Sequence, residues 1–365
     1  MDKLYTQRGF LPLNDPLTHF PYDSEFAVLD TLGHDLPSML EDKNFRAYAR
    51  TFNIPTFTKT AATTEDLPLL HLLYVRLGFL ASAYINQVDQ ERATLLPNNI
   101  AAPLVKVCNL LKRPPILSYD GYALYNWKRF RKDGPIALGN IDTIQNFVHL
   151  YDEHWFILIH VEIEAIAAKM FGFIQDALAA ATEQDGDGVN AALSLIEQSI
   201  WQQTAVLRRI PEKMDPGLYF KRFRPYIRYF ENVVYEGIDQ QAHQFRGETG
   251  AQSTIFPVLI AFMKIEHQSS VLTEHLRDMR QYMPAAHRAL LEELEQAPSI
   301  KPFADNERYN GVLEAMATFR ETHYGWAQEY IHRRTEDPNG TGGTPYMKWL
   351  KQLIDETRAH KLVSS

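Results

Sequence analysis

Residues 306–334 read NERYNGVLEAMATFRETHYGWAQEYIHRR and predict one long amphipathic helix. Large side chains recur in this stretch every three or four residues, which places them on one face of a helix. The members of this face are Val312, Met316, Phe319, His323, Trp326 and Tyr330. A histidine therefore stands in the middle of a face that packs against the rest of the protein.

The position of His323 has two interpretations. A buried histidine is most often a core residue satisfied by one hydrogen bond. A neutral imidazole among methionine and aromatic side chains also suits an axial ligand of haem iron. Arg320 precedes it by three residues, so its guanidinium would lie one turn away and pair with a carboxylate of the same cofactor. Spacing alone leaves both interpretations open.

The remaining chain also predicts mainly helices, with little alternation at period two. The longest are expected at 152–182 and 189–209, joined by the turn EQDGDG. Two short helices are expected within 24–52, the second opening at Asp35, where Pro37 suits the first turn. Others are expected at 64–89, 101–112, 120–131, 216–230, 252–266, 271–283, 285–296 and 345–360. We expect an all-α fold, an irregular helical bundle, with a boundary at the pair Pro114-Pro115. A small, mostly helical N-terminal region would span 1–113 and a larger helical domain 114–365.

Composition narrows the class of protein. The 365 residues are 45% hydrophobic and can bury a large core. Lys and Arg total 37 against 45 Asp and Glu, a net charge of −8, so no nucleic-acid partner is expected. The single cysteine, Cys108, excludes a disulfide framework and a thiolate metal cluster. The start MDKLYTQRGF has no apolar signal region and no stretch approaches 18 uncharged apolar residues, so we expect a soluble, cytoplasmic protein without a membrane partner.

A second group of residues lies in DPGLYFKRFRPYIRYF, residues 215–230. Here Arg224 is a helical neighbour of Tyr219, Phe220 and Phe223, so an arginine stands among aromatic rings. It is either a surface arginine whose stem lies along apolar side chains, or a planar fork that binds a substrate carboxylate while the rings hold a flat apolar body. Pro225 disturbs the helix at this point, as the wall of a pocket requires.

Several dispersed stretches together resemble the indoleamine 2,3-dioxygenases, haem enzymes that open the indole ring of tryptophan. The resemblance runs from about residue 95 to the C-terminus and is loose before it. The stretches are NNIAAP (98–103), PPILSYDGYALYNWK (114–128), VEI (161–163), VVYEG (233–237), GAQSTIF (250–256), RDMRQYMPAAHR (277–288), RETHYGWAQEYI (320–331) and GTGGTPYM (340–347). Because they occur in the family's order, the set is far more specific than any one member.

The resemblance implies a bundle that encloses haem b and assigns roles in it. His323 becomes the proximal ligand of the haem iron and Arg320 the partner of a propionate. Arg224 becomes the group that binds the substrate carboxylate, and Thr341 reaches that carboxylate or the ammonium. The implied lining of the substrate pocket is Tyr219, Phe220, Tyr119, Tyr122, Thr249, Gly250 and Ala251.

The activity implied is the insertion of both atoms of O2 across the indole C2–C3 bond, which gives N-formylkynurenine in the first step of the kynurenine pathway. The expected partners are tryptophan or an indoleamine, O2, and an electron donor that keeps the iron ferrous. The resemblance implies no side-chain base, because the electron-rich indole is itself the nucleophile. The iron is then the reactive centre, and no catalytic side chain is assigned.

Two departures from the family pattern leave alternatives open. Tyr219 stands where the family commonly has phenylalanine. Ungapped matching at VEI places Leu158 where many indoleamine enzymes have serine and tryptophan 2,3-dioxygenase has histidine. If the matching shifts, His154 or His160 becomes the distal residue, although we favour a structural role for His160. The chain could therefore be a related haem enzyme with a different reaction on a tryptophan derivative, or a haem-binding sensor without turnover.

The glycine-rich stretch NGTGGTPYM, residues 339–347, does not predict a phosphate-binding loop. Such a loop needs a lysine after the glycines, whereas here Thr344 and Pro345 follow them. Pro345 suits the first turn of the last helix. We expect a lid that closes over the substrate and brings Thr341 to it.

Overall fold

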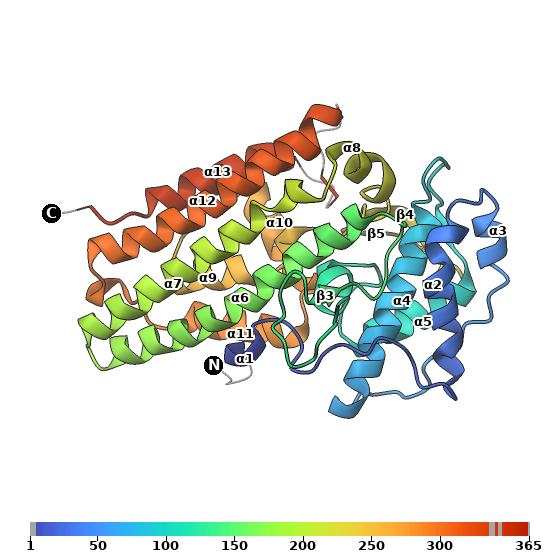
Figure 1. The fold of residues 1–365 in the computed structure, drawn as a ribbon, viewed down its shortest axis with the longest axis horizontal. Helices are drawn as coiled ribbons and strands as arrows, with labels where there is room; N and C mark the ends of the chain where they lie inside the picture. Colours follow the sequence, from blue (N-terminus) through green and yellow to red (C-terminus); the bar gives the residue numbers. More distant parts are fainter. Residues whose placement is uncertain (1–4, 336–339, 342–344, 364–365) are drawn as a thin grey trace.

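The computed structural model describes residues 5–335, 340–341 and 345–363 (Figure 1). It confirms the expected all-α class. The long helices α6 (Tyr151–Thr182), α7 (Gly186–Leu207), α12 (Asn306–Tyr330) and α13 (Tyr346–Ala359) lie side by side along the long axis of the molecule. The other helices of the described residues are α1 (Tyr5–Arg8), α2 (Val28–Met39), α3 (Phe45–Ala49), α4 (Leu67–Ile85), α5 (Asn98–Leu110), α8 (Pro216–Leu218), α9 (Ile255–Phe262), α10 (Val271–Met279) and α11 (Ala285–Gln296).

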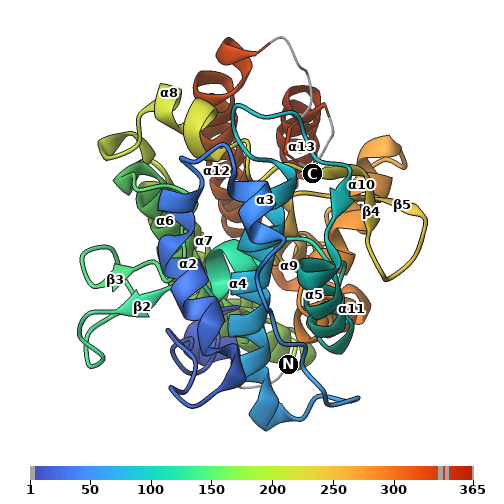
Figure 2. The ribbon, with the colours of Figure 1, turned by 90° about the vertical axis from the view of Figure 1, so that its right-hand side faces the viewer.

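Helices α2 to α5 lie together at one end of the long axis, around α4 (Figure 2). With the turn before it, α4 spans Thr64–Ile85 and is long and apolar enough to cross a membrane, but 83% of its apolar window is buried inside the protein. It is therefore placed as a core helix. The buried hydrophobic cluster continues from this end into α6, α7 and α12, and the division at residue 113 stays a prediction.

The helix expected to open at Asp35 is instead the second half of α2, and Pro37 lies inside that helix. A proline has no N–H to donate to the carbonyl four residues earlier, which is that of Gly33. The side-chain Nε2 of Gln145 donates to the Gly33 carbonyl at 2.8 Å instead. The missing helical bond is thus replaced by a tertiary one, and the helix continues through the proline.

Two segments expected to be continuous helices are helical only in their first part. Residues 120–131 form one π-helical turn, Asp120–Leu124, and then strand β2 (Lys128–Arg129), which pairs with β3 (Ile141–Asp142). Residues 216–230 form α8, a π-helical turn at Tyr219–Phe223, and the start of β4 (Phe230–Tyr235). Strand β4 lies between β1 (Leu95–Leu96), which is parallel to it, and β5 (Ala242–Phe245), which is antiparallel. Single π-helical turns often occur at functional sites.

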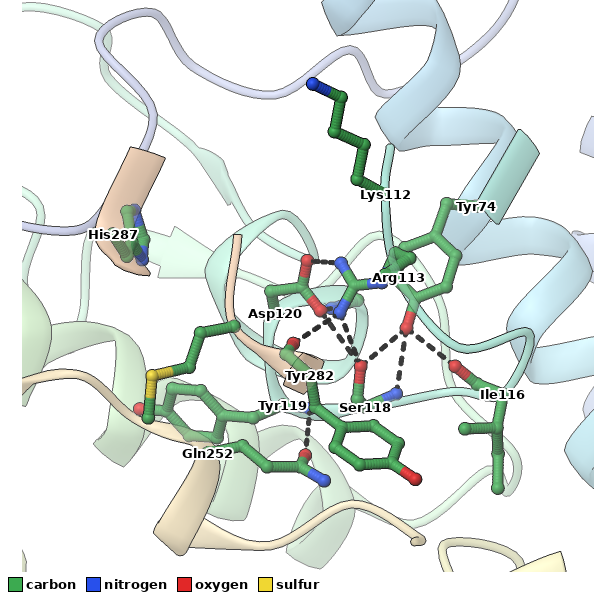
Figure 3. Close-up of polar contacts among 12 residues, drawn as sticks. Tyr74, Lys112, Arg113, Ile116, Ser118, Tyr119, Asp120, Gln252, Tyr282 and His287 are labelled. Atoms are coloured by element: carbon green, nitrogen blue, oxygen red, sulfur yellow. Dashed lines mark hydrogen bonds and ion pairs between the residues drawn. The ribbon is translucent and has the colours of Figure 1, made fainter. Parts of the chain in front are cut away.

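A buried ion pair fixes the first of these turns (Figure 3). Arg113 pairs with Asp120, the first residue of the turn, and both side chains are at most 2% exposed. The Arg113 guanidinium also donates to Ser118 Oγ and to the carbonyl of Tyr282, each at 2.6 Å. It lies over the ring of Tyr74 from α4, 4.2 Å from the ring centre. The network therefore joins α4, the π-helical turn and the segment after α10.

Replacing Asp120 by alanine should strongly destabilise the protein, because the Arg113 charge would be left buried and unpaired. We expect a loss of about 3–5 kcal/mol in the free energy of unfolding, measured by urea denaturation. Glu212→Ala is the matched control, since it breaks the exposed pair of Glu212 with Arg209 and should cost less than about 1 kcal/mol. Similar losses in the two variants would contradict this account.

Candidate functional site

A cavity of about 680 Å³ lies among α6, α7, α9, α10, α12 and α13. Its wall combines aromatic and aliphatic side chains with polar and ionisable ones. Cavities of this size hold cofactors and small substrates. Among the described residues, no three His, Cys, Asp or Glu side chains come together to hold a bare metal ion.

His323 faces this cavity from α12. Its side chain lies inside the protein, and the surface that it exposes faces the cavity. Burial and, to a smaller degree, the nearby His160 together lower the pKa of the imidazole to about 4, so the ring is neutral at pH 7. Phe319 and Trp326 of the same helix face also line the cavity, whereas Val312 and Met316 are fully buried beyond it. A neutral imidazole directed into an apolar cavity can serve as an axial iron ligand.

Arg320 lines the cavity one turn before His323. Its Nη1 atom donates to the carbonyl of Leu353 at 2.9 Å and to the hydroxyl of Thr357, which holds the guanidinium against α13. Burial lowers its pKa to about 10, so the group keeps its charge at pH 7. Its other nitrogens have no acceptor among the described residues, and they can meet a carboxylate of a bound ligand.

Of the three candidates for a distal residue, only His160 lines the cavity. Its Nδ1 donates to the carbonyl of Phe156 at 2.7 Å, and burial lowers its pKa, so Nε2 is an unprotonated acceptor. Leu158 is buried away from the cavity, and His154 contacts Asp142 at 2.9 Å instead. Our preference for a structural role thus missed the placement of His160 on the cavity wall.

Two of the three expected tyrosines line the cavity. The hydroxyl of Tyr119 donates to Glu164 Oε1 at 2.8 Å, and its ring lies 5.9 Å from that of His160. Tyr219 lies 5.4 Å from Phe156, ring centre to ring centre. Tyr122 is fully buried outside the cavity wall, and its hydroxyl donates to Glu153 at 3.2 Å.

Arg224 and Phe220 lie next to the cavity but do not line it. The guanidinium of Arg224 is 5.4 Å from the centre of the Phe220 ring, and the residue is 6% exposed. Its Nε atom is buried without a hydrogen-bond partner. Burial raises the pKa of Tyr219 to about 12, although Arg224 acts to lower it, which places Arg224 beside Tyr219. Arg224 thus lies among the aromatic rings, as expected, but it does not line the cavity.

The loop after β5 carries Thr249, Gly250 and Ala251, which line the cavity as expected. Gln252 fixes this loop. Its side chain accepts from the N–H of Tyr119 at 2.9 Å (Figure 3). It also donates to the carbonyl of Gly247 at 2.9 Å. A Cβ on Gly250 would meet no atom within 4 Å, so open space lies above it.

Thr341 also lines the cavity, and its carbonyl accepts from the N–H of Tyr229 at 2.9 Å. The expected lid falls partly outside the described residues, since 336–339 and 342–344 are not among them. The closing movement of that loop stays a prediction.

Sequence reasoning missed two buried carboxyl groups at the cavity. Glu164 lies behind Tyr119 and also accepts from Ser253 Oγ at 2.8 Å; burial raises its pKa to about 7. Glu248 lies on the cavity wall, and burial raises its pKa to about 8. The available signal was position, because Glu248 lies two residues before Gly250, the start of the matched stretch GAQSTIF.

Comparison with known proteins extends the resemblance to nearly the whole chain. A family model described as indoleamine 2,3-dioxygenase matches residues 3–337. Indoleamine 2,3-dioxygenase 1 of Rattus norvegicus is 29% identical over 90% of this chain and 87% of its own length. The 6-hydroxytryptophan 2,3-dioxygenase of Fusarium equiseti is 28% identical over 95% and 94%. The indoleamine 2,3-dioxygenase of Saccharomyces cerevisiae is 26% identical over 96% and 91%.

Replacing Gln252 by leucine should loosen the cavity wall, because two buried backbone groups would lose their partner. We expect a cost of about 1–3 kcal/mol for each group and faster hydrogen exchange at the Tyr119 amide. Gln281→Leu is the control, since Gln281 is exposed and its side chain bonds only Asp278 among the described residues. Unchanged protection of the Tyr119 amide in Gln252→Leu would refute the role given to Gln252.

Proposed function

Because the chain belongs to the indoleamine 2,3-dioxygenase family of haem-dependent oxidoreductases, we propose that it opens the indole ring of L-tryptophan or a related indoleamine. O2 is the second substrate and N-formylkynurenine the product, the first step of the kynurenine pathway. The observation that carries the proposal is the neutral His323 facing a cavity of about 680 Å³ with aromatic walls. The proposal includes an electron donor for the iron and a cytoplasmic location.

The residues of the cavity fit a haem. His323 would hold the iron, since its ring is neutral and makes no hydrogen bond to a described residue. Arg320 would meet a propionate with the nitrogens that α13 leaves free. The chemistry that bound haem supplies here is the activation of dioxygen. The protein supplies position, polarity and the exclusion of water.

The aromatic wall would orient the substrate. Tyr119, Phe156 and Tyr219 offer flat faces to an indole ring. The Nε2 atom of His160 is the acceptor on the α6 side, where it can hold a proton donor of the substrate or a water.

Arg224 and Thr341 would bind the amino-acid end of the substrate. The orphaned Nε of Arg224 supports this role, since a buried guanidinium without a partner at one nitrogen is costly unless a ligand completes it. Because Arg224 stands behind Tyr219, the role requires that ring to shift when substrate enters. Phe220 and Tyr122 would then support the wall from behind it.

Ring-hydroxylated tryptophans are the alternative substrates. The relative from Fusarium equiseti is named as a dioxygenase of 6-hydroxytryptophan. The polar groups on the aromatic wall, among them Glu248 and His160, suit a substrate that carries one more hydrogen-bond donor than tryptophan.

The proposal is tested on purified protein supplied with haem. A Soret band should appear, and aerobic L-tryptophan with a reductant should yield the ultraviolet absorbance of N-formylkynurenine. Absence of the Soret band would remove every haem function. A band that shifts with tryptophan but gives no product would replace ring opening by a different reaction.

His323→Ala should abolish haem retention, because the proposed bond between the protein and the iron would be lost. The measure is the ratio of Soret to protein absorbance after gel filtration. His154→Ala is the matched control, since His154 is on α6 but does not line the cavity. Retention of haem by His323→Ala with an unchanged spectrum would exclude His323 as the ligand.

Arg224→Ala should keep haem but bind tryptophan more weakly. Loss of hydrogen bonds to a charged group corresponds to about 1.5–3 kcal/mol, or about 10- to 100-fold in the dissociation constant. The measure is the tryptophan-induced shift of the Soret band. Arg222→Ala provides the comparison, because Arg222 is exposed two residues away. Equal affinities in the two variants would remove Arg224 from this role.

A further inference from the structure

Glu248 occupies a fixed position on the cavity wall. Its N–H donates to the carbonyl of Ile227 at 3.1 Å, and Gln252 holds the preceding carbonyl of Gly247 at 2.9 Å. A Cβ on Gly247 would lie 2.4 Å from the Ile227 carbonyl, so the loop packs too tightly there for another residue. The backbone on both sides of Glu248 is therefore set by close contacts, and its side chain has a defined direction.

The carboxyl of Glu248 makes no hydrogen bond with any described residue, although the residue is only 4% exposed. Two other buried glutamates of the region differ from it. Glu153 accepts from the N–H groups of Phe147 and Val148 at 2.9 and 3.0 Å, and Glu164 accepts from two hydroxyls. Burying a carboxyl without partners costs stability. A group kept at such a cost on a cavity wall points to a ligand as its partner.

The surroundings of Glu248 are aromatic. Tyr119 and Tyr219 line the same cavity, and the charge of Glu248 would raise the pKa of both. The hydroxyl of Tyr119 already donates to Glu164. Burial raises the pKa of Glu248 to about 8.

We propose that Glu248 determines substrate specificity by accepting a hydrogen bond from a donor on the ring system of the substrate. The donor is the indole N–H or a hydroxyl on the ring, and the two share the same chemistry. The inference rests on the proposed function, since it takes the ligand to be a tryptophan or a derivative. In either protonation state the carboxyl keeps an acceptor oxygen for this bond.

The ring, and not the ammonium of the amino acid, is the partner that we assign to Glu248. The α-ammonium and α-carboxylate are bonded to the same carbon, so they enter neighbouring parts of a site. Tyr119 and Tyr219, to which the proposed function gives the flat ring, line the same cavity as Glu248, whereas Arg224, the proposed partner of the carboxylate, does not line it.

The test measures dissociation constants by the Soret shift of the haem-loaded protein. The ligands are L-tryptophan, 1-methyl-L-tryptophan, which lacks the N–H donor, and the 5- and 6-hydroxy derivatives, which add one. Glu248→Met keeps the size of the side chain but removes the acceptor, and Glu248→Gln keeps an acceptor oxygen. Glu231→Ala is the control, since Glu231 is exposed on β4.

The wild type should prefer the ligand with the donor by at least about tenfold in one of the two comparisons. Preference for tryptophan over its 1-methyl derivative identifies the N–H, and preference for a hydroxylated derivative over tryptophan identifies the hydroxyl. Glu248→Met should abolish that preference, whereas Glu248→Gln and Glu231→Ala should retain it. The melting temperature of Glu248→Met should equal or exceed that of the wild type, because an unpartnered carboxyl is removed.

Preferences unchanged by Glu248→Met would overturn the inference while leaving the proposed function intact. A lower melting temperature of that variant would also overturn it, since the carboxyl would then have a structural partner. Absence of any shift of the Soret band with all four ligands would overturn the proposed function and this inference together.

Discussion

Arg113 and Asp120 form an ion pair that is almost wholly shielded from solvent. One wall of the cavity depends on this pair for its position. A buried pair needs further hydrogen bonds to offset the loss of water, and Ser118 and the Tyr282 carbonyl accept from Arg113 Nη2 here, while its Nε has no partner among the described residues. The pair holds the start of the π-helical turn that follows Tyr119. Gln252 then connects Tyr119 to the loop of residues 247–251. Segments far apart in sequence thus face α12 across one cavity.

The periodic parts of the fold were predictable from sequence. Helices α6, α7, α11 and α12 follow their expected ranges closely, because a repeat of three and four residues records which face is buried. The structure differs from the predicted elements where tertiary contacts override the local preferences of the sequence. Gln145 supplies the bond that Pro37 cannot make, and π-helical turns end two expected helices early. The family resemblance predicted that Tyr119, Thr249 and His323 belong to one site, and all three line the cavity. No local pattern in the sequence indicates that Glu248 lines it as well.

The cavity wall carries ionisable side chains at several places, among them Lys264, Glu266, Arg277, Arg280, Glu295 and Arg320. Other groups on or behind the wall are held neutral, because burial lowers the pKa of His323 and His160 and raises that of Glu164 and Glu248. These neutral groups offer directed donors and acceptors to a ligand. These groups cost stability in the absence of a ligand, which is typical of residues kept for function.

The central claim is that the cavity holds haem with His323 on the iron. A crystal structure of the haem-loaded protein tests it most directly. The account predicts that a ring nitrogen of His323 is bonded to the iron, that a propionate meets Arg320, and that His160 lies on the opposite face. Haem bound elsewhere, or iron bonded to His160 with His323 free, would contradict it.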